Sequence, residues 1–258
     1  MQSANQKEAG AKAPMSDAEK QTRIELAACY RLAAHYKMTD TIYTHISARV
    51  PNEPGHFLIN PYGFMWEEIT ASSLVKIDVD GNKIDASPHR VNPAGFTIHS
   101  AVHMGRHSAA WVMHTHTRSG FAVSCLEEGL LPLSQIALQY YSQVGYHDYE
   151  GIALDLDERG RIVDALGDNV ALILRNHGLL TVGETAGQMF SNMFYLNRAC
   201  EIQESTLSMG RPLKKIDDAI IKRVSEQFGQ MAYDDGDLLL EWDAQVRLAD
   251  RLDPGFRD

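Results

Sequence analysis

Apolar residues recur at helical spacing near the start of the chain. One apolar stripe is formed by Ile24, Ala27, Ala28, Leu32 and Tyr36. The S-x-x-E pattern at 16–19 is typical of a capping box at a helix N-terminus, so we expect a helix over about 17–37. Residues 1–15 lack this periodicity, which predicts a flexible N-terminal tail ahead of one domain over 16–258 with helices at its C-terminal end.

The pattern then changes to strand-like alternation rich in β-branched and aromatic residues. Residues 42–50 and 57–59 are separated by the turn sequence P-N-E-P-G, which predicts an antiparallel hairpin. Residues 74–80 alternate again and end at the turn D-G-N, after which the chain returns through Lys83 and Ile84.

Helices and strands follow one another through the rest of the chain. The expected helices are 94–106, 118–126, 184–209 and 212–230, and the expected strands are 111–116, 170–174 and 179–182. Hairpin signals and helix-flanked strands therefore occur in one sequence. We expect a single α/β domain with a mixed sheet.

The charge balance argues against two classes of partner. With 24 Lys and Arg against 34 Asp and Glu, the net charge of -10 disfavours binding to nucleic acid or to an anionic membrane. The three cysteines have no C-x-x-C spacing, which favours a reducing, cytoplasmic compartment. No apolar run reaches the roughly 18 residues of a membrane span, and residues 1–15 lack the apolar segment of a signal peptide.

Histidines are concentrated in the middle of the chain. Five of the eleven fall within one short stretch, namely His99, His103, His107, His114 and His116. Alternation along the expected strand puts His114 and His116 on one face. His177 lies at a strand end before Gly178, whose missing side chain allows a close backbone approach. Three neutral imidazoles leave coordination positions open on zinc or another divalent ion, as catalytic sites require.

Four motifs together resemble the class II aldolase/adducin family. They are T-H-I-S at 44–47, I-N-P-Y-G at 59–63, H-T-H at 114–116 and N-H-G at 176–178. The resemblance covers about 19–230 and is nearest to adducin-head-like bacterial members. It implies a three-layer α/β/α domain around a central, mainly antiparallel sheet, with a divalent metal held by His114, His116 and His177. It also implies a homotetramer whose active sites lie between subunits.

Two departures separate this chain from the sugar-phosphate aldolases of that family. Those enzymes carry a Gly-Asn pair in the first hairpin and a Ser-Ser-Glu run before the helix. This chain has Thr44-His45 and Pro93-Ala94-Gly95 at those places. Proline and alanine cannot donate the side-chain hydrogen bonds that a phosphate would use, and glycine cannot transfer a proton. We therefore expect a substrate without phosphate.

Two histidines are candidates to replace the missing catalytic glutamate. His99 and His103 are four residues apart on the expected helix, so they share a face and follow Gly95 closely. Either could act as the acid or base. The alternative is that each packs in the interior or bonds to neighbouring backbone.

The candidate substrate contacts lie in the first hairpin, the following turn and the start of the helix. His45 stands where the family has an anion-binding Asn, so it could hold a substrate carboxylate when protonated, or merely cap the sheet. The resemblance assigns Asn60, Tyr62 and Gly63 to a substrate-contacting loop, although N-P-x-G is also a general turn sequence. Gly95 completes the expected substrate-binding set.

These features favour a divalent-metal lyase, of the aldolase or decarboxylase type, that acts on a small keto or hydroxy acid through a metal-stabilised enolate. The missing glutamate favours decarboxylation, because loss of CO₂ from a 3-oxo acid needs no base in the cleaving step. Zinc is the expected metal, with manganese or iron as alternatives. Two other functions stay open: an Fe(II)-dependent oxygenase on the same fold, and a non-catalytic oligomerisation module like the adducin head.

Overall fold

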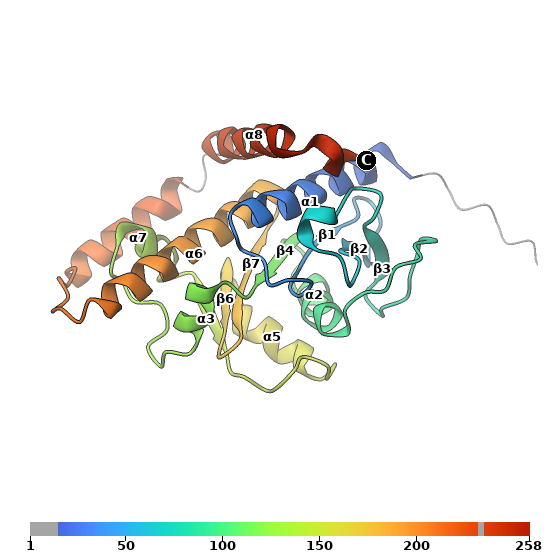
Figure 1. Cartoon of the computed structure of the whole chain (residues 1–258). Coiled ribbons are helices and arrows are strands. Elements are labelled where there is room, and N and C mark those ends of the chain that lie inside the picture. Colours follow the sequence, from blue (N-terminus) through green and yellow to red (C-terminus); the bar gives the residue numbers. More distant parts are fainter. Residues whose placement is uncertain (1–14, 232–234) are drawn as a thin grey trace, which may run out of the picture.

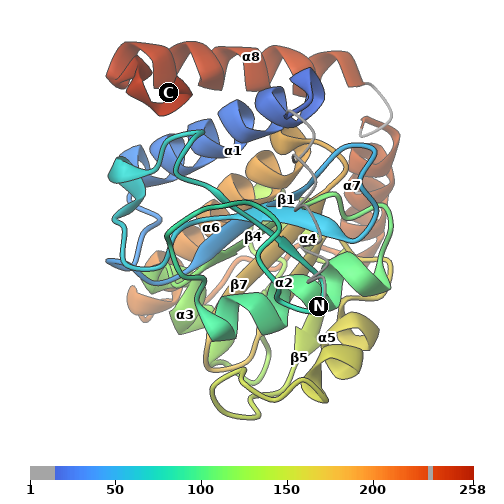
Figure 2. The same cartoon turned by 90° about the vertical axis from the view of Figure 1, so that its right-hand side faces the viewer.

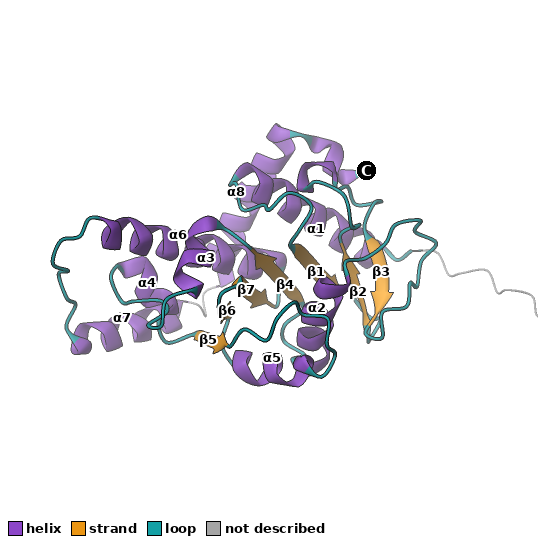
Figure 3. Ribbon diagram, turned by 60° about the horizontal axis from the view of Figure 1, so that its bottom comes forward, coloured by secondary structure: helices purple, strands orange, loops and turns teal. Residues whose placement is uncertain are grey.

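A seven-stranded mixed sheet forms the centre of the computed structural model, which describes residues 15–231 and 235–258. The predicted tail, apart from Met15, lies outside the described residues. Within the described chain the strand order is β3-β2-β1-β4-β7-β6-β5, and every neighbouring pair is antiparallel except β5 and β6. Figure 3 shows β3 and β5 at opposite edges. The strands are β1 (His45–Arg49), β2 (His56–Ile59), β3 (Val75–Asp78), β4 (Trp111–Thr115), β5 (Val144–His147), β6 (Ala171–Leu174) and β7 (Gly178–Gly183).

Helices cover both faces of this sheet. One face carries α1 (Asp17–His35) and α6 (Ala186–Ser208), with α3 (Arg118–Ser124) and α4 (Gln135–Tyr140) packed on α6. The other face carries α2 (Pro93–Gly105) and α5 (Glu158–Leu166). Figures 1 and 2 show α8 (Asp235–Leu252) outside α1. The remaining elements are η1 (Trp66–Glu68), α7 (Asp218–Met231) and η2 (Pro254–Arg257). The expected three-layer α/β/α fold with a mainly antiparallel sheet is confirmed.

Strand alternation divides the apolar side chains between two cores. Met113, Ile173 and Leu179 pack with α1 and α6 in the larger core. Their neighbours along the same strands face α2 and α5 instead, and these are Val112, Leu172 and Leu180. Successive residues of β4 therefore point to opposite layers, so residues 112, 114 and 116 share the α2 side.

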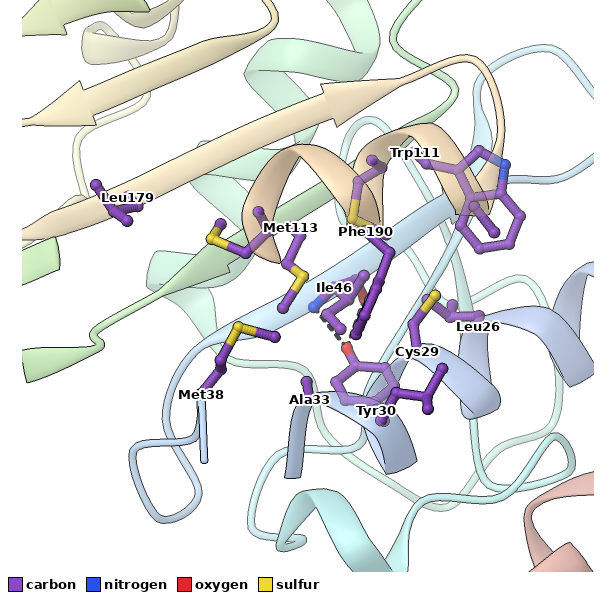
Figure 4. Close-up of a cluster of buried hydrophobic side chains, with 14 of the residues drawn as sticks. Leu26, Cys29, Tyr30, Ala33, Met38, Ile46, Trp111, Met113, Leu179 and Phe190 are labelled. Carbon is purple, nitrogen blue, oxygen red and sulfur yellow. Dashed lines mark hydrogen bonds between the residues drawn. The ribbon is translucent and has the colours of Figure 1, made fainter. Parts of the chain in front are cut away.

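A buried tyrosine ties α1 to the first hairpin. The hydroxyl of Tyr30 accepts a hydrogen bond from the backbone N–H of Ile46 at 2.6 Å. The same hydroxyl lies 2.5 Å from the Ile46 carbonyl and 2.9 Å from Oδ1 of Asn60, either of which can accept its proton. Figure 4 shows the Tyr30 and Ile46 contact among the packed side chains. These bonds fix β1 and the start of the N-P-Y-G turn against the helix.

The structure differs from the sequence prediction mainly between 127 and 169. The elements α4, β5 and α5 lie there, where no element was expected, because each is short and β5 contains Gly145. The last expected helix begins at Asp218 rather than at about 212, since the segment around Pro212 is exposed and irregular. Among the described residues, no helix is both long enough and apolar enough to span a bilayer.

Replacing Tyr30 with Phe tests the anchoring role. Tyr30→Phe removes one oxygen and leaves the Ile46 N–H and the Asn60 amide without their partner in the core. We expect the free energy of unfolding to fall by about 1–3 kcal/mol in chemical denaturation. The matched control is Tyr141→Phe, since the Tyr141 side chain is exposed. A Tyr30→Phe protein no less stable than this control would contradict the role.

Candidate metal centre and its cavity

The structure brings three histidines together at the end of the central strands. His114 is in β4, His116 lies just beyond it, and His177 directly precedes β7. One ligand atom from each lies within 4.8 Å of the others. Gly178 permits this approach, because a Cβ at that position would collide with the carbonyl oxygen of Thr115. The residues of the predicted triad thus form a cluster that could hold a metal ion.

Hydrogen bonds orient two of these rings. Nδ1 of His114 lies 2.9 Å from the carbonyl oxygen of Leu179, and Nδ1 of His116 lies 2.9 Å from Oδ2 of Asp40. A carbonyl and a carboxylate can only accept, so both Nδ1 atoms carry the proton. In the neutral form of each ring Nε2 then keeps a lone pair, and the two Nε2 atoms face each other at 3.0 Å. A cation between them would relieve this repulsion, so the donor set fits a divalent metal.

The electrostatics also suit metal ligation. Burial lowers the pKa of His114 well below its usual value, and the neighbouring His177, His116 and His45 lower it further. Burial lowers the pKa of His177 to about 4, with smaller effects from His116 and His147. Both imidazoles are consequently neutral at pH 7, which is the form that binds a metal.

The three histidines line a cavity of about 430 Å³. Most of the surrounding wall is aromatic or aliphatic, and includes Tyr43, Tyr62, Ile98, Phe121, Ile152 and Leu154. Among the described residues that line it there is no lysine, arginine, aspartate or glutamate. The protein part of the cavity thus offers imidazole, hydroxyl and amide groups, but no fixed charge.

His45 occupies the space that a side chain at position 95 would need. Its ring lines the cavity and stacks on His114, with ring centroids 5.2 Å apart and planes inclined by 27°. A Cβ built on Gly95 would lie 2.5 Å from Cδ2 and 2.8 Å from Nε2 of His45. Glycine at 95 is therefore required by the position of this histidine. The residues at the two expected departures, His45 and Gly95, thus lie against each other in this chain.

His99 and His103 lie behind His45 and do not line the cavity. Both are buried on α2, as expected from their shared helix face. Nε2 of His99 is 3.1 Å from Nδ1 of His45, and the hydroxyl of Ser47 is 2.5 Å from Nδ1 of His99 and 2.7 Å from Nε2 of His103. The structure therefore connects them to the cavity through His45, without bringing either ring to the cavity.

The expected substrate loop is divided between the cavity and the core. Tyr62 lines the cavity. Asn60 is buried, lies within hydrogen-bonding distance of Tyr30 and is not among the residues that line the cavity. Gly63 has a φ of 103° that suits a turn, and it does not line the cavity either.

Several residues of the site were not expected from the sequence. Asp40 lies in an irregular segment before β1, where no local pattern signals a contact with His116. Ser47 could have been found, because it lies two residues after His45 and so faces the same side of the sheet. The wall formed by 149–154 comes from a segment without strand or helix.

Comparisons of the sequence agree with the arrangement. The family model of the class II aldolase and adducin N-terminal domain matches residues 24–204. A Caulobacter vibrioides protein named "Putative aldolase class 2 protein" is 52% identical over 249 residues, which cover 96% of each chain. Alpha-adducin of Rattus norvegicus is 42% identical over 252 residues, which are 93% of this chain and 34% of that protein.

Solved structures share the same fold. An aldolase II superfamily protein from Pseudomonas syringae has a TM-score of 0.90 and 46% identity, covering 94% of this chain and 97% of that one. L-fuculose 1-phosphate aldolase from Glaciozyma antarctica PI12 has a TM-score of 0.80 and 25% identity, covering 96% of this chain and 97% of its own. The chain therefore belongs to the class II aldolase and adducin N-terminal domain family.

Proposed function

We propose that this protein is a divalent-metal lyase of the aldolase or decarboxylase type that acts on a small, non-phosphorylated keto or hydroxy acid. One observation carries the proposal: three imidazoles converge in a cavity whose described lining has no lysine or arginine. The family, which includes aldolases, supports C–C bond chemistry.

His114, His116 and His177 would hold the metal. When bound, a divalent cation supplies the positive charge that attracts a carboxylate and stabilises negative charge developing on an adjacent substrate oxygen. Zinc is the expected ion because three nitrogen ligands suit it, and manganese or iron are the alternatives. Asp40 and the Leu179 carbonyl hold two of the imidazoles with Nε2 free.

The cavity favours decarboxylation over aldol cleavage. No carboxylate lines its described wall, and Gly95 cannot transfer a proton. A 3-oxo acid breaks its bond to the carboxyl carbon, releases CO₂ and leaves the electron pair as an enolate that later takes a proton. No base is needed in that cleavage. Retro-aldol cleavage must remove a hydroxyl proton first, which would fall to a histidine or a tyrosine here.

The aromatic and aliphatic wall has two further consequences. Tyr43, Tyr62 and Phe121 would displace part of the water around a bound substrate, which strengthens electrostatic interactions inside the cavity. A phosphate dianion would find no lysine or arginine partner on the described wall, in a protein of net charge -10. A compact acid is therefore the better fit.

Metal content tests the triad. We expect His114→Ala and His177→Ala to lose stoichiometric metal binding, because two imidazoles hold a divalent ion poorly. Asp40→Ala should weaken metal affinity about 10- to 100-fold, since it frees the His116 ring to turn. His107→Ala is the control, because that histidine is exposed on another part of the chain. Full occupancy in either triad variant, by elemental analysis, would rule the triad out.

The metal that copurifies also separates the alternatives. Zinc or manganese in protein prepared without chelator would support the lyase. Iron together with O₂ consumption would instead support the oxygenase. Absence of any metal at the triad would favour a non-catalytic module. The similarity of this chain to alpha-adducin would then support the same interpretation.

Paired substrates test the charge preference. We expect kcat/KM for a non-phosphorylated 3-oxo or 2-oxo acid to exceed that for fuculose or rhamnulose phosphate by at least about tenfold, or about 1.4 kcal/mol of transition-state stabilisation. Release of CO₂, pyruvate or aldehyde is the readout. Equal or faster turnover of the sugar phosphates would contradict the proposal.

We further propose a homotetramer with its active sites between subunits. Beside the cavity, the segment 149–156 exposes Tyr149, Ile152, Leu154 and Leu156, whose side chains are 52–73% exposed. Light scattering at micromolar concentration should give a tetramer. Leu156→Asp should weaken the assembly, whereas Leu240→Asp, an exposed leucine on α8, should not. A monomeric wild-type protein would reject this proposal.

A further inference from the structure

A chain of hydrogen bonds leads from the cavity into the interior. It runs from His45 to His99, from His99 to Ser47, and from Ser47 to His103. All four side chains are buried, with at most 4% of each residue exposed. Burial lowers the pKa of His99 well below the usual value, and lowers that of His103 to about 3. Each of these two rings is therefore neutral and carries one N–H.

The serine gives this chain a direction. A hydroxyl has one proton, so Ser47 can donate to His99 or to His103, but not to both. If it donates to His99, then His103 donates to Ser47, and His99 must use its Nε2–H to donate to Nδ1 of His45. His45 then carries its proton on Nε2. The reverse direction puts a proton on Nδ1 of His45 instead.

The buried end of the chain distinguishes the two directions. The reverse direction puts an N–H on Nδ1 of His103, a buried atom with no partner in hydrogen-bonding geometry. The Ala109 backbone partly offsets the fall in the pKa of this ring, but it does not reach hydrogen-bonding geometry with Nδ1. A buried N–H without an acceptor is rarer and costlier than an unused lone pair. The first direction is therefore the stable one.

At the cavity end of the chain of hydrogen bonds, Nε2 of His45 has no protein partner among the described residues. It is also not among the described side-chain atoms that are both fully buried and without a hydrogen-bond partner. His45 lines the cavity, and the missing side chain of Gly95 leaves room for its Nε2 edge. We propose that His99, Ser47 and His103 are positioning residues that fix His45 as the Nε2–H tautomer, which donates a hydrogen bond to a carboxylate oxygen of the substrate. The donor role rests on the proposed function, whereas the tautomer does not.

This assignment accounts for a ring that stays neutral and still binds an anion. A neutral imidazole donates from one nitrogen only, so its use depends on which nitrogen holds the proton. Donation from Nε2 supplies one hydrogen bond to an acid without adding a cation, in keeping with a cavity whose described lining has no lysine or arginine.

Nitrogen-15 NMR of the histidine side chains tests the tautomer directly. In full-length protein, both metal-free and zinc-loaded, long-range proton–nitrogen spectra should show Nε2 of His45 as the protonated nitrogen. His45→Gln identifies the resonance. Adding malonate to the zinc-loaded protein should shift the His45 Nε2–H signal. A proton on Nδ1, or a signal unmoved by saturating malonate, would overturn the proposal.

Ser47 variants test the positioning role. Ser47→Ala should give a mixture of His45 tautomers and raise KM for the acid about three- to tenfold, the value of one neutral hydrogen bond, at unchanged metal content. Ser47→Thr keeps the hydroxyl and should restore the single tautomer. The matched control is Ser100→Ala, a buried serine whose hydroxyl bonds to the Thr97 carbonyl. An unchanged tautomer in folded Ser47→Ala would refute the role, even if the protein turns over no acid.

Discussion

Side-chain alternation along β1 and β4 is the constraint on which the whole site depends. His45 pairs with His114 and Ser47 with Val112 across the two strands, so all four side chains face α2. A slip of one residue would turn His114 into the large core and bring Met113 to the cavity. Tyr30 holds β1 in place from the opposite layer, which couples the packing of α1 to the geometry of the site.

The sequence predicted the parts of the site that depend on local periodicity. Alternation placed His114 and His116 together, helical spacing placed His99 and His103 on one face, and Gly178 marked a close backbone approach. The parts that it did not predict depend on tertiary contacts. Nothing near Asp40 signals that it orients His116 from 76 residues away.

The difference between local periodicity and tertiary contacts also explains which elements of the fold, and which residues of the substrate loop, could be placed from the sequence. Long, strongly periodic segments such as α1 and α6 were predicted, whereas the short β5 and α5 were not, because their burial depends on neighbouring elements. Asn60 was expected to contact the substrate, but its side chain lies in the core within hydrogen-bonding distance of the Tyr30 hydroxyl. A turn sequence alone cannot show which way such a side chain faces.

Similarity to an aldolase is stronger evidence for the fold of this chain than for any reaction that it catalyses. The fuculose phosphate aldolase of Glaciozyma antarctica shares the architecture at 25% identity. In this chain, His45 takes the space beside α2 that Gly95 leaves free, and the described cavity wall has no cationic side chain. Function follows from such exchanges within the site, because one scaffold can support several chemistries.

Anomalous X-ray diffraction from crystals soaked in a zinc or manganese salt tests the central claim most directly. The account predicts one strong peak about 2.0–2.2 Å from Nε2 of His114 and of His116 and from a ring nitrogen of His177, with Asp40 still bonded to His116. A peak bound elsewhere, or none at the triad at saturating metal, would contradict it.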